Sequence, residues 1–182
     1  MTADTRGSVM AQRLGPLEPA GGRWVIGDPA RKAGLSIVLT PEGLEHRRQG
    51  QTTPLATVGW GRFVNLGVSA AHRNWQTTAA AGFVSAFATA DWGRDGCSLQ
   101  GDLRHPHEAW SARYTHHERR YAAGHVIVLQ ALFDQLSTAG ALHRLGDPEW
   151  LAAAVTALSS YTSWHGPRGS RLVGTTIRAL GV

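Results

Sequence analysis

The alternation of apolar and polar residues predicts β-strands over the first two thirds of the chain. Residues 35–40 (LSIVLT) alternate, with two leucines and an isoleucine on one side of an extended backbone. Residues 40–43 (TPEG) then have turn chemistry, because proline fixes φ and glycine permits a left-handed backbone. Residues 44–48 return as the partner strand, so this segment predicts an antiparallel hairpin.

A second hairpin is predicted around residues 103–107, with strands over 96–104 and 109–121. Alternation in the later strand places Trp110, Ala112, Tyr114 and His116 on one face, and Ser111, Arg113, Thr115 and His117 on the other. Residues 54–60 and 62–68 are expected to form a connection and a further strand.

Residues 79–90 (AAAGFVSAFATA) fit two structures. Their alanines favour a helix. Their larger side chains alternate as in a strand, at Phe83, Ser85, Phe87 and Thr89. We favour the strand, although the helix stays open.

Helical spacing replaces alternation in the last third of the chain. A first helix ends near Gly140 and carries the apolar residues Val126, Leu129, Leu132, Phe133 and Leu136 on one side. A second begins at Asp147, an N-cap residue followed by proline, and runs to about Leu158. Residues 166–169 (GPRG) break the chain before a short last helix over 172–180.

Strands followed by helices predict an α+β domain rather than a parallel βαβ sheet. Residues 1–22 hold several glycines and prolines without periodicity, and we expect a flexible N-terminal leader there. Residues 23–140 are then a β domain with a closing helix, and residues 141–182 are a C-terminal helical extension.

The layout of this β domain resembles that of bacterial pleckstrin-homology-like (PH-like) domains. The resemblance rests on the TPEGL hairpin at 40–44, the connection over 54–60 that ends in Gly-Trp, and the late amphipathic helix. It implies an antiparallel β-barrel or sandwich of about seven strands, plugged at one end by a helix. It also implies a binding platform rather than an enzyme, since that fold generally presents loops to a protein partner or a lipid headgroup.

Composition narrows the functional classes. The chain of 182 residues has a net charge of +5, but lysine occurs once, and the many arginines are spread along the chain as a high-GC coding sequence would give. Direct nucleic-acid binding is therefore disfavoured. Its longest apolar stretches are too short for a transmembrane segment, and no signal peptide is recognisable, so a cytoplasmic location is expected. Cys97 is the only cysteine, which excludes an internal disulfide.

Candidate chemistry concentrates between Asp102 and His125, where five of the nine histidines lie. His105 and His107 are two apart, and His116 is expected across the hairpin as a third ligand for zinc or another divalent metal. Such a site would support a metal-dependent hydrolase. Pro106 favours a turn instead, and no complete catalytic signature is present. We therefore assign no catalytic residue and favour no cofactor.

Two further groups of residues are candidates for binding a ligand or a partner. The first consists of arginines among the histidines, whose guanidinium groups suit an anionic surface: Arg104, Arg113, Arg119 and Arg120. The second consists of tryptophans beside expected loops: Trp75 and Trp92.

The favoured hypothesis is a non-catalytic interaction module that binds a protein partner or an anionic, peripheral-membrane surface. Its C-terminal helices offer an additional interface, including one for a homodimer. The alternatives are the metal-dependent hydrolase and a basic nucleic-acid-binding protein, so whether the chain is an enzyme stays open.

Overall fold

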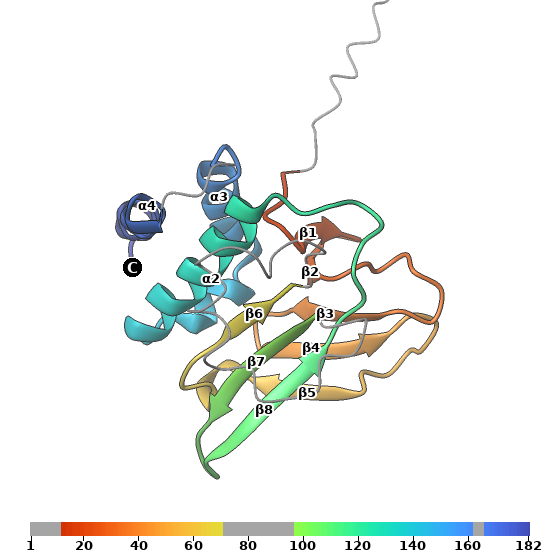
Figure 1. Cartoon of the computed structure of the whole chain (residues 1–182). Helices are drawn as coiled ribbons and strands as arrows, with labels where there is room; N and C mark the ends of the chain where they lie inside the picture. Colours follow the sequence, from red (N-terminus) through yellow and green to blue (C-terminus); the bar gives the residue numbers. More distant parts are fainter. Residues whose placement is uncertain (1–11, 71–96, 162–165) are drawn as a thin grey trace, which may run out of the picture.

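The computed structural model describes residues 12–70, 97–161 and 166–182, with side chains from 169 onward in the last range. Five strands form an antiparallel sheet in which each strand pairs with the next along the chain (Figure 1). These strands are β1 (Leu17–Ala20), β2 (Arg23–Ile26), β3 (Leu35–Leu39), β4 (Gly43–Arg48) and β5 (Ala56–Gly59).

A second antiparallel sheet has three strands in the order β6-β7-β8. A 3-10 turn, η1 (Trp60–Arg62), leads from β5 toward it. Its strands are β6 (Gly67–Ser69), β7 (Ser98–Leu103) and β8 (Glu108–Arg113). The described residues thus form eight strands in two sheets, and no closed barrel forms among them.

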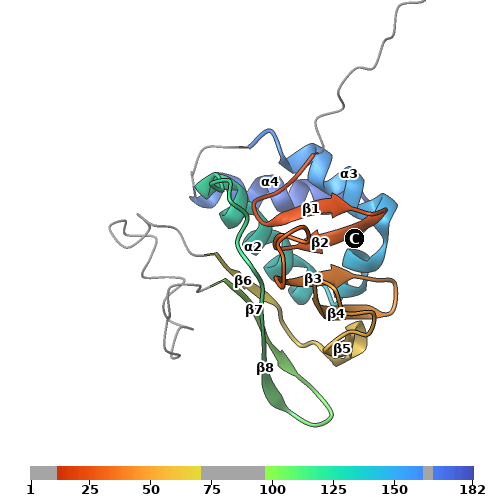
Figure 2. The same ribbon diagram turned by 90° about the vertical axis from the view of Figure 1, so that its right-hand side faces the viewer.

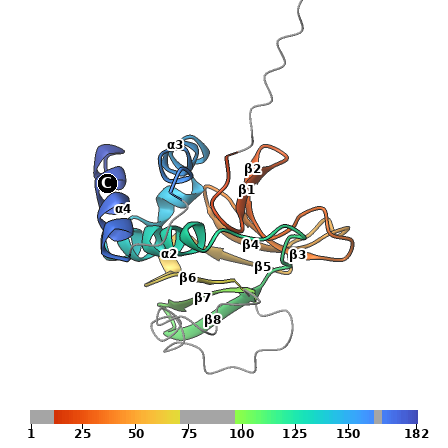
Figure 3. The ribbon, with the colours of Figure 1, turned by 45° about the horizontal axis from the view of Figure 1, so that its top comes forward.

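The helices lie together on one side of the sheets (Figures 1 and 3). They are α2 (Ala123–Thr138), the 3-10 helix η3 (Leu142–Gly146), α3 (Pro148–Leu158) and α4 (Gly166–Ala179). None of the helices in the described ranges has the length and apolar character needed to span a membrane. The α+β class is therefore confirmed.

Both hairpins that the sequence predicts are present. In the first, Leu39 pairs with Leu44 next to the turn, and the Gly43 N–H donates to the Thr40 hydroxyl oxygen at 3.2 Å. In the second, β7 and β8 pair from Ser98–Arg113 to Leu103–Glu108. The strand expected over 62–68 is wrong in extent, because pairing with β7 through β6 begins only at Gly67.

Local chemistry signals the end of α2 and the start of α3. Gly140 has a φ of +65° directly after α2, where glycine bears the left-handed backbone without strain. The Asp147 carboxylate accepts hydrogen bonds from the backbone N–H groups of Glu149 and Trp150, so α3 begins as predicted. The start predicted for the last helix is wrong, because α4 begins at Gly166. Pro167 fits its first turn, where no N–H is needed.

The N-terminal leader is shorter than predicted. Leu14 and Leu17 are fully buried, and residues 17–20 form β1 against β2. Their apolar side chains are drawn into the core, which outweighs the turn-forming glycines and prolines around them. Residues 1–11, the rest of the predicted leader, lie outside the described residues.

One hydrophobic core unites both sheets and all the helices. Buried residues of the expected extension, such as Leu151, Val155 and Ile177, belong to the same cluster as Ile37 of β3 and Leu99 of β7. The core therefore does not divide near residue 140.

Three buried tryptophans fasten the elements around this core. The indole N–H of Trp24 donates to the Pro148 carbonyl at 3.2 Å and ties β2 to the start of α3. The indole N–H of Trp60 donates to the Thr40 carbonyl, and the indole N–H of Trp150 donates to the Leu180 carbonyl. Each indole covers apolar neighbours with its ring and satisfies its single donor on a distant backbone carbonyl.

Gly146 provides a test of how tightly η3 is seated on the first sheet. A Cβ atom at this position would lie 2.3 Å from the Thr40 carbonyl oxygen and 2.6 Å from the Trp60 indole nitrogen. We expect Gly146→Ala to lower the free energy of unfolding by about 1–3 kcal/mol in chemical denaturation. Gly61→Ala, whose Cβ would meet nothing within 4 Å, is the matched control and should change it by less than about 0.5 kcal/mol. Equal effects of the two substitutions would contradict this account.

Candidate functional site

The three histidines of the metal hypothesis do not come together. His105 and His107 are exposed in the turn between β7 and β8, with ring centroids 6.2 Å apart. His116 lies beyond the opposite end of β8, nine residues from His107 and about 30 Å away along an extended chain. Within the described ranges, no three His, Cys, Asp or Glu side chains are placed to hold a metal ion.

The four candidate arginines are likewise dispersed. Arg104, at the hairpin tip, donates to the Phe63 carbonyl at 3.2 Å. Arg113 is exposed at the end of β8, and Arg120 is exposed after it. Only Arg119 enters a cluster of charged residues. The candidates Trp75 and Trp92, like residues 79–90, lie outside the described residues.

The segment after β8 leaves its sheet and crosses to the first one. The backbone N–H of Tyr114 still bonds to Cys97, but that of Thr115 donates to the Leu35 carbonyl of β3 at 2.8 Å. The Thr115 hydroxyl accepts from the Leu35 N–H at 2.8 Å, and the Thr115 carbonyl accepts from the Asp28 N–H at 2.9 Å. Residues 116–121 are thereby carried to β1.

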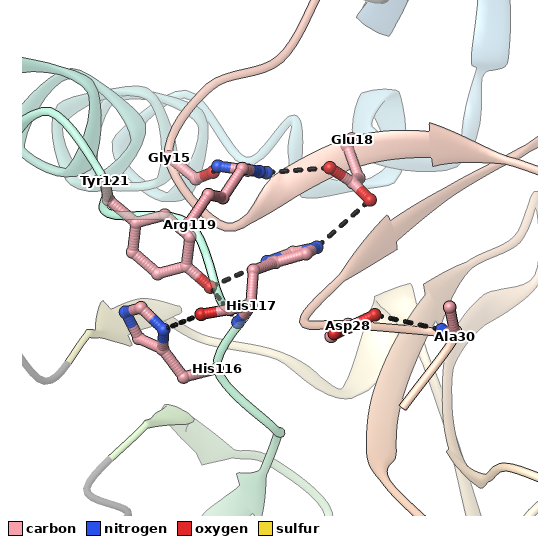
Figure 4. Close-up of polar contacts among 8 residues, drawn as sticks. All are labelled: Gly15, Glu18, Asp28, Ala30, His116, His117, Arg119 and Tyr121. Carbon is pink, nitrogen blue, oxygen red and sulfur yellow. Dashed lines mark hydrogen bonds and ion pairs between the residues drawn. The ribbon is translucent and has the colours of Figure 1, made fainter. Parts of the chain in front are cut away.

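At this crossing Glu18, His117, Arg119 and Tyr121 form what we call the polar cluster (Figure 4). One oxygen of the Glu18 carboxylate accepts from the Arg119 guanidinium at 2.7 Å, and the other lies 3.0 Å from His117 Nε2. This second contact is an ion pair whenever His117 is protonated. Arg119 also donates to the Gly15 carbonyl at 3.0 Å, which holds the turn before β1.

Tyr121 completes the polar cluster from the other side of the His117 ring. Its hydroxyl lies 2.8 Å from His117 Nδ1 and accepts from the His117 backbone N–H at 3.1 Å. This arrangement assigns the proton between them to the phenol and leaves Nδ1 as acceptor. The His116 ring lies 4.1 Å from the Tyr121 ring, and the Arg119 guanidinium lies 5.2 Å from it.

Burial and charge shift the pKa values in this cluster. Burial lowers the pKa of His117 below its ordinary 6.5, helped by Arg119 and opposed by Glu18 and Asp28. Burial acts to raise the pKa of Glu18, but the hydrogen bond from Arg119 and the charge of His117 outweigh it, so that pKa lies below 4.5. Burial raises the pKa of Tyr121 far above its ordinary value.

The chain of hydroxyl, imidazole and carboxylate has the connectivity of a catalytic relay, but its environment opposes that use. A phenol whose pKa is raised stays protonated and is a poor nucleophile. His117 is 8% exposed and Tyr121 is 6% exposed, so a substrate does not reach either group. The polar cluster instead links β1 to the segment between β8 and α2.

Sequence patterns missed this cluster for two identifiable reasons. Alternation put His117 on the same face as Ser111 and Arg113, but β8 ends at Arg113 and its alternation ends there too. Glu18 fell within the expected leader. Leu17 beside Glu18 was the available signal, since an apolar residue next to an acid fits a half-buried strand.

Comparisons with known proteins identify no relative of this chain: no family model, curated protein or solved structure matches it.

The lowered pKa of His117 predicts that the protein loses stability as pH falls below 6.5. Because the pKa of His117 in the folded protein is below 6.5, its contribution is fully present above pH 6.5 and is lost as pH falls. The free energy of unfolding should therefore decrease as pH falls below 6.5, by at most about 1.4 kcal/mol per pH unit for one proton. Below pH 4.5, protonation of Glu18 adds a further loss.

The substitution His117→Asn tests this assignment, since asparagine keeps an acceptor for Tyr121 but does not titrate. Chemical denaturation at several pH values should show two differences from the wild type. The free energy of unfolding should be lower by about 1–3 kcal/mol at pH 7.5, and it should depend less steeply on pH between pH 6.5 and 5. His143→Asn replaces an exposed histidine and should leave both unchanged. A wild-type slope in His117→Asn would refute the assignment.

Proposed function

We propose that this protein is a non-catalytic interaction module that presents its β7–β8 hairpin to an acidic surface of a protein partner. The observation that supports this most directly is the hairpin itself. It projects from the body in two perpendicular views (Figures 1 and 2). The residues of its tip are exposed and mostly basic or imidazole-bearing: Arg104, His105, Pro106 and His107.

The hairpin is braced near its tip by residues of η1 and of the segment that follows η1. The Arg62 guanidinium donates to the Arg104 carbonyl at 3.0 Å and to the Glu108 carboxylate at 2.8 Å. The Asn65 side chain makes two hydrogen bonds with Asp102. Its amide nitrogen donates to the Asp102 carboxylate, and its amide oxygen accepts from the Asp102 backbone N–H. A surface that is ordered before binding loses less entropy on binding, which favours recognition by such a hairpin.

Packing between the hairpin and Phe63, which follows η1, adds to this rigidity. The Trp110 ring meets Phe63 edge-on, with centroids 5.2 Å apart, and Phe63 is 2% exposed. The tip therefore extends from a fixed base. Its exposed donors and the net charge of +5 suit an acidic partner.

Burial of the polar cluster supports the non-catalytic part of the proposal. The one connected set of imidazole, carboxylate and phenol in the described residues is closed to substrates. Nothing favours the hydrolase alternative over binding, because His105 and His107 stand apart from His116.

A PH-like relationship remains a proposal, supported by the two antiparallel sheets with a helix packed after them. A cytoplasmic location likewise remains a proposal.

Affinity capture from a lysate of the source cells, followed by purification of the captured protein, tests this function. The variant Arg104→Gln, His105→Asn, His107→Gln removes the basic character while keeping the turn. Asparagine suits position 105 because its φ is +58°. We expect titration calorimetry to show at least a tenfold loss of affinity for the captured partner, and weaker wild-type binding at high salt.

Arg48→Gln changes an exposed arginine at the end of β4, away from the hairpin, and serves as the control. It should bind like the wild type. Equal affinity of the hairpin variant and the control would contradict the proposed surface. Vesicles of phosphatidylserine, compared with phosphatidylcholine, distinguish a lipid surface: selective binding that the hairpin variant loses would replace the protein partner by an anionic membrane.

A further inference from the structure

The outer strands of the two sheets differ in how their edges are protected. An exposed edge carries unpaired backbone N–H and C=O groups that bind any extended chain, and proteins normally cover it, charge it or interrupt it with proline. The described sheets have four outer strands: β1, β5, β6 and β8.

Three of these edges are protected. β1 contains Pro19, which has no N–H to offer, and Glu18 of the same strand is held by Arg119. β6 is covered by α2, whose Gln130 side chain accepts from the Val68 N–H at 2.7 Å. β8 begins and ends at charged residues, Glu108 and Arg113.

The fourth edge, β5, has none of these features in the part of the chain that the structure describes. Residues 55–59 (LATVG) carry no charge and no proline. Their pairing with β4 runs without a break from His46–Ala56 to Gly43–Gly59, and the Leu55 N–H donates to the His46 carbonyl at 2.7 Å. Leu55 is 46% exposed, and no described strand pairs with the outer side of β5.

The register with β4 identifies the free backbone groups. The Trp60 N–H donates to the Glu42 carbonyl at 3.3 Å, so alternate residues Val58 and Ala56 also direct their backbone groups at β4. Thr57 and Gly59 then direct theirs outward. An added antiparallel strand would bond to these two residues.

We propose that the occupant of this edge is β5 of a second copy of the chain, which would join two five-stranded sheets across a two-fold axis. In the register that pairs Thr57 with Thr57 of the partner subunit, Leu55 stands opposite Gly59 of the partner subunit. The Leu55 N–H stays bonded to the His46 carbonyl, so the main-chain donors of the contact are those of Thr57 and Gly59. A Cβ at Gly59 would meet only the Glu42 carbonyl oxygen, at 3.6 Å, so this position leaves room for the exposed leucine. This association goes beyond the proposed function and does not use the hairpin.

Charge favours a second copy over a different partner. A two-fold axis brings identical residues together, so any charge on β5 would repel its own copy. Residues 55–59 have none, and the nearest charged pair on β4 is neutralised, since Arg47 donates to Glu45 at 2.7 Å. An acidic or basic peptide would find no complementary charge on this strand. Because the strand is short, we expect a weak dimer, with dissociation in the micromolar range or above.

Sedimentation equilibrium of the full chain from about 1 µM to about 500 µM tests the proposal. We expect the mass to rise from 19.5 kDa toward twice that value. Thr57→Pro removes an N–H that faces away from β4, so it should preserve the fold and weaken dimerisation at least tenfold. Thr57→Lys should do the same through repulsion between the two lysines. Ser111→Lys, on exposed β8, is the control and should dimerise like the wild type.

Amide hydrogen exchange of the wild type gives a readout that depends on no variant. The Thr57 and Gly59 N–H groups should become more protected as the protein concentration rises. A wild type that stays monomeric throughout overturns the proposal. A dimer that persists in both folded Thr57 variants, without protection of these amides, assigns the contact to another face and overturns it as well. The hairpin variant should dimerise normally, so failure here is separate from failure of the proposed function.

Discussion

The structure depends on the burial of helix α2 between the sheets and the later helices. Each sheet has one apolar face that must be covered, and α2 supplies side chains to both the strands and the helices. Leu129, Leu132 and Phe133 are fully buried, each stabilising the fold by about 2 kcal/mol relative to exposure. α2 contacts β6, η3 and α4. The helical C-terminal third is therefore an integral part of the core.

The polar cluster follows from this arrangement. The chain must travel from the end of β8 to the start of α2, and its route passes over β1. Burial there requires partners for every charged group, and Glu18, His117 and Arg119 supply them to one another. Glu18 and Arg119 are 101 residues apart in the chain. The cluster attaches this connecting segment to the N-terminal strand, and the lowered pKa of His117 predicts that the attachment weakens in acid.

The two proposed binding surfaces lie where the sheets end. The β7–β8 hairpin extends beyond the core and exposes donors on a rigid base, which suits an acidic partner. The β5 edge exposes backbone groups without charge, which suits an identical strand. They use different elements and different chemistry, so one protein can engage both at once.

The sequence alone determined the local features, because contacts between near neighbours specify them. The TPEG turn, the Asp147 cap and the Gly140 stop are of this kind, and they defined the α+β class. Only the tertiary structure decided which residues meet across long separations. It buried His117 beside Glu18, left His105 and His107 apart from His116, and gave the outer side of β5 no partner among the described strands. The physical reason is that alternation reports the face of a residue only while its strand continues, and β8 stops at Arg113.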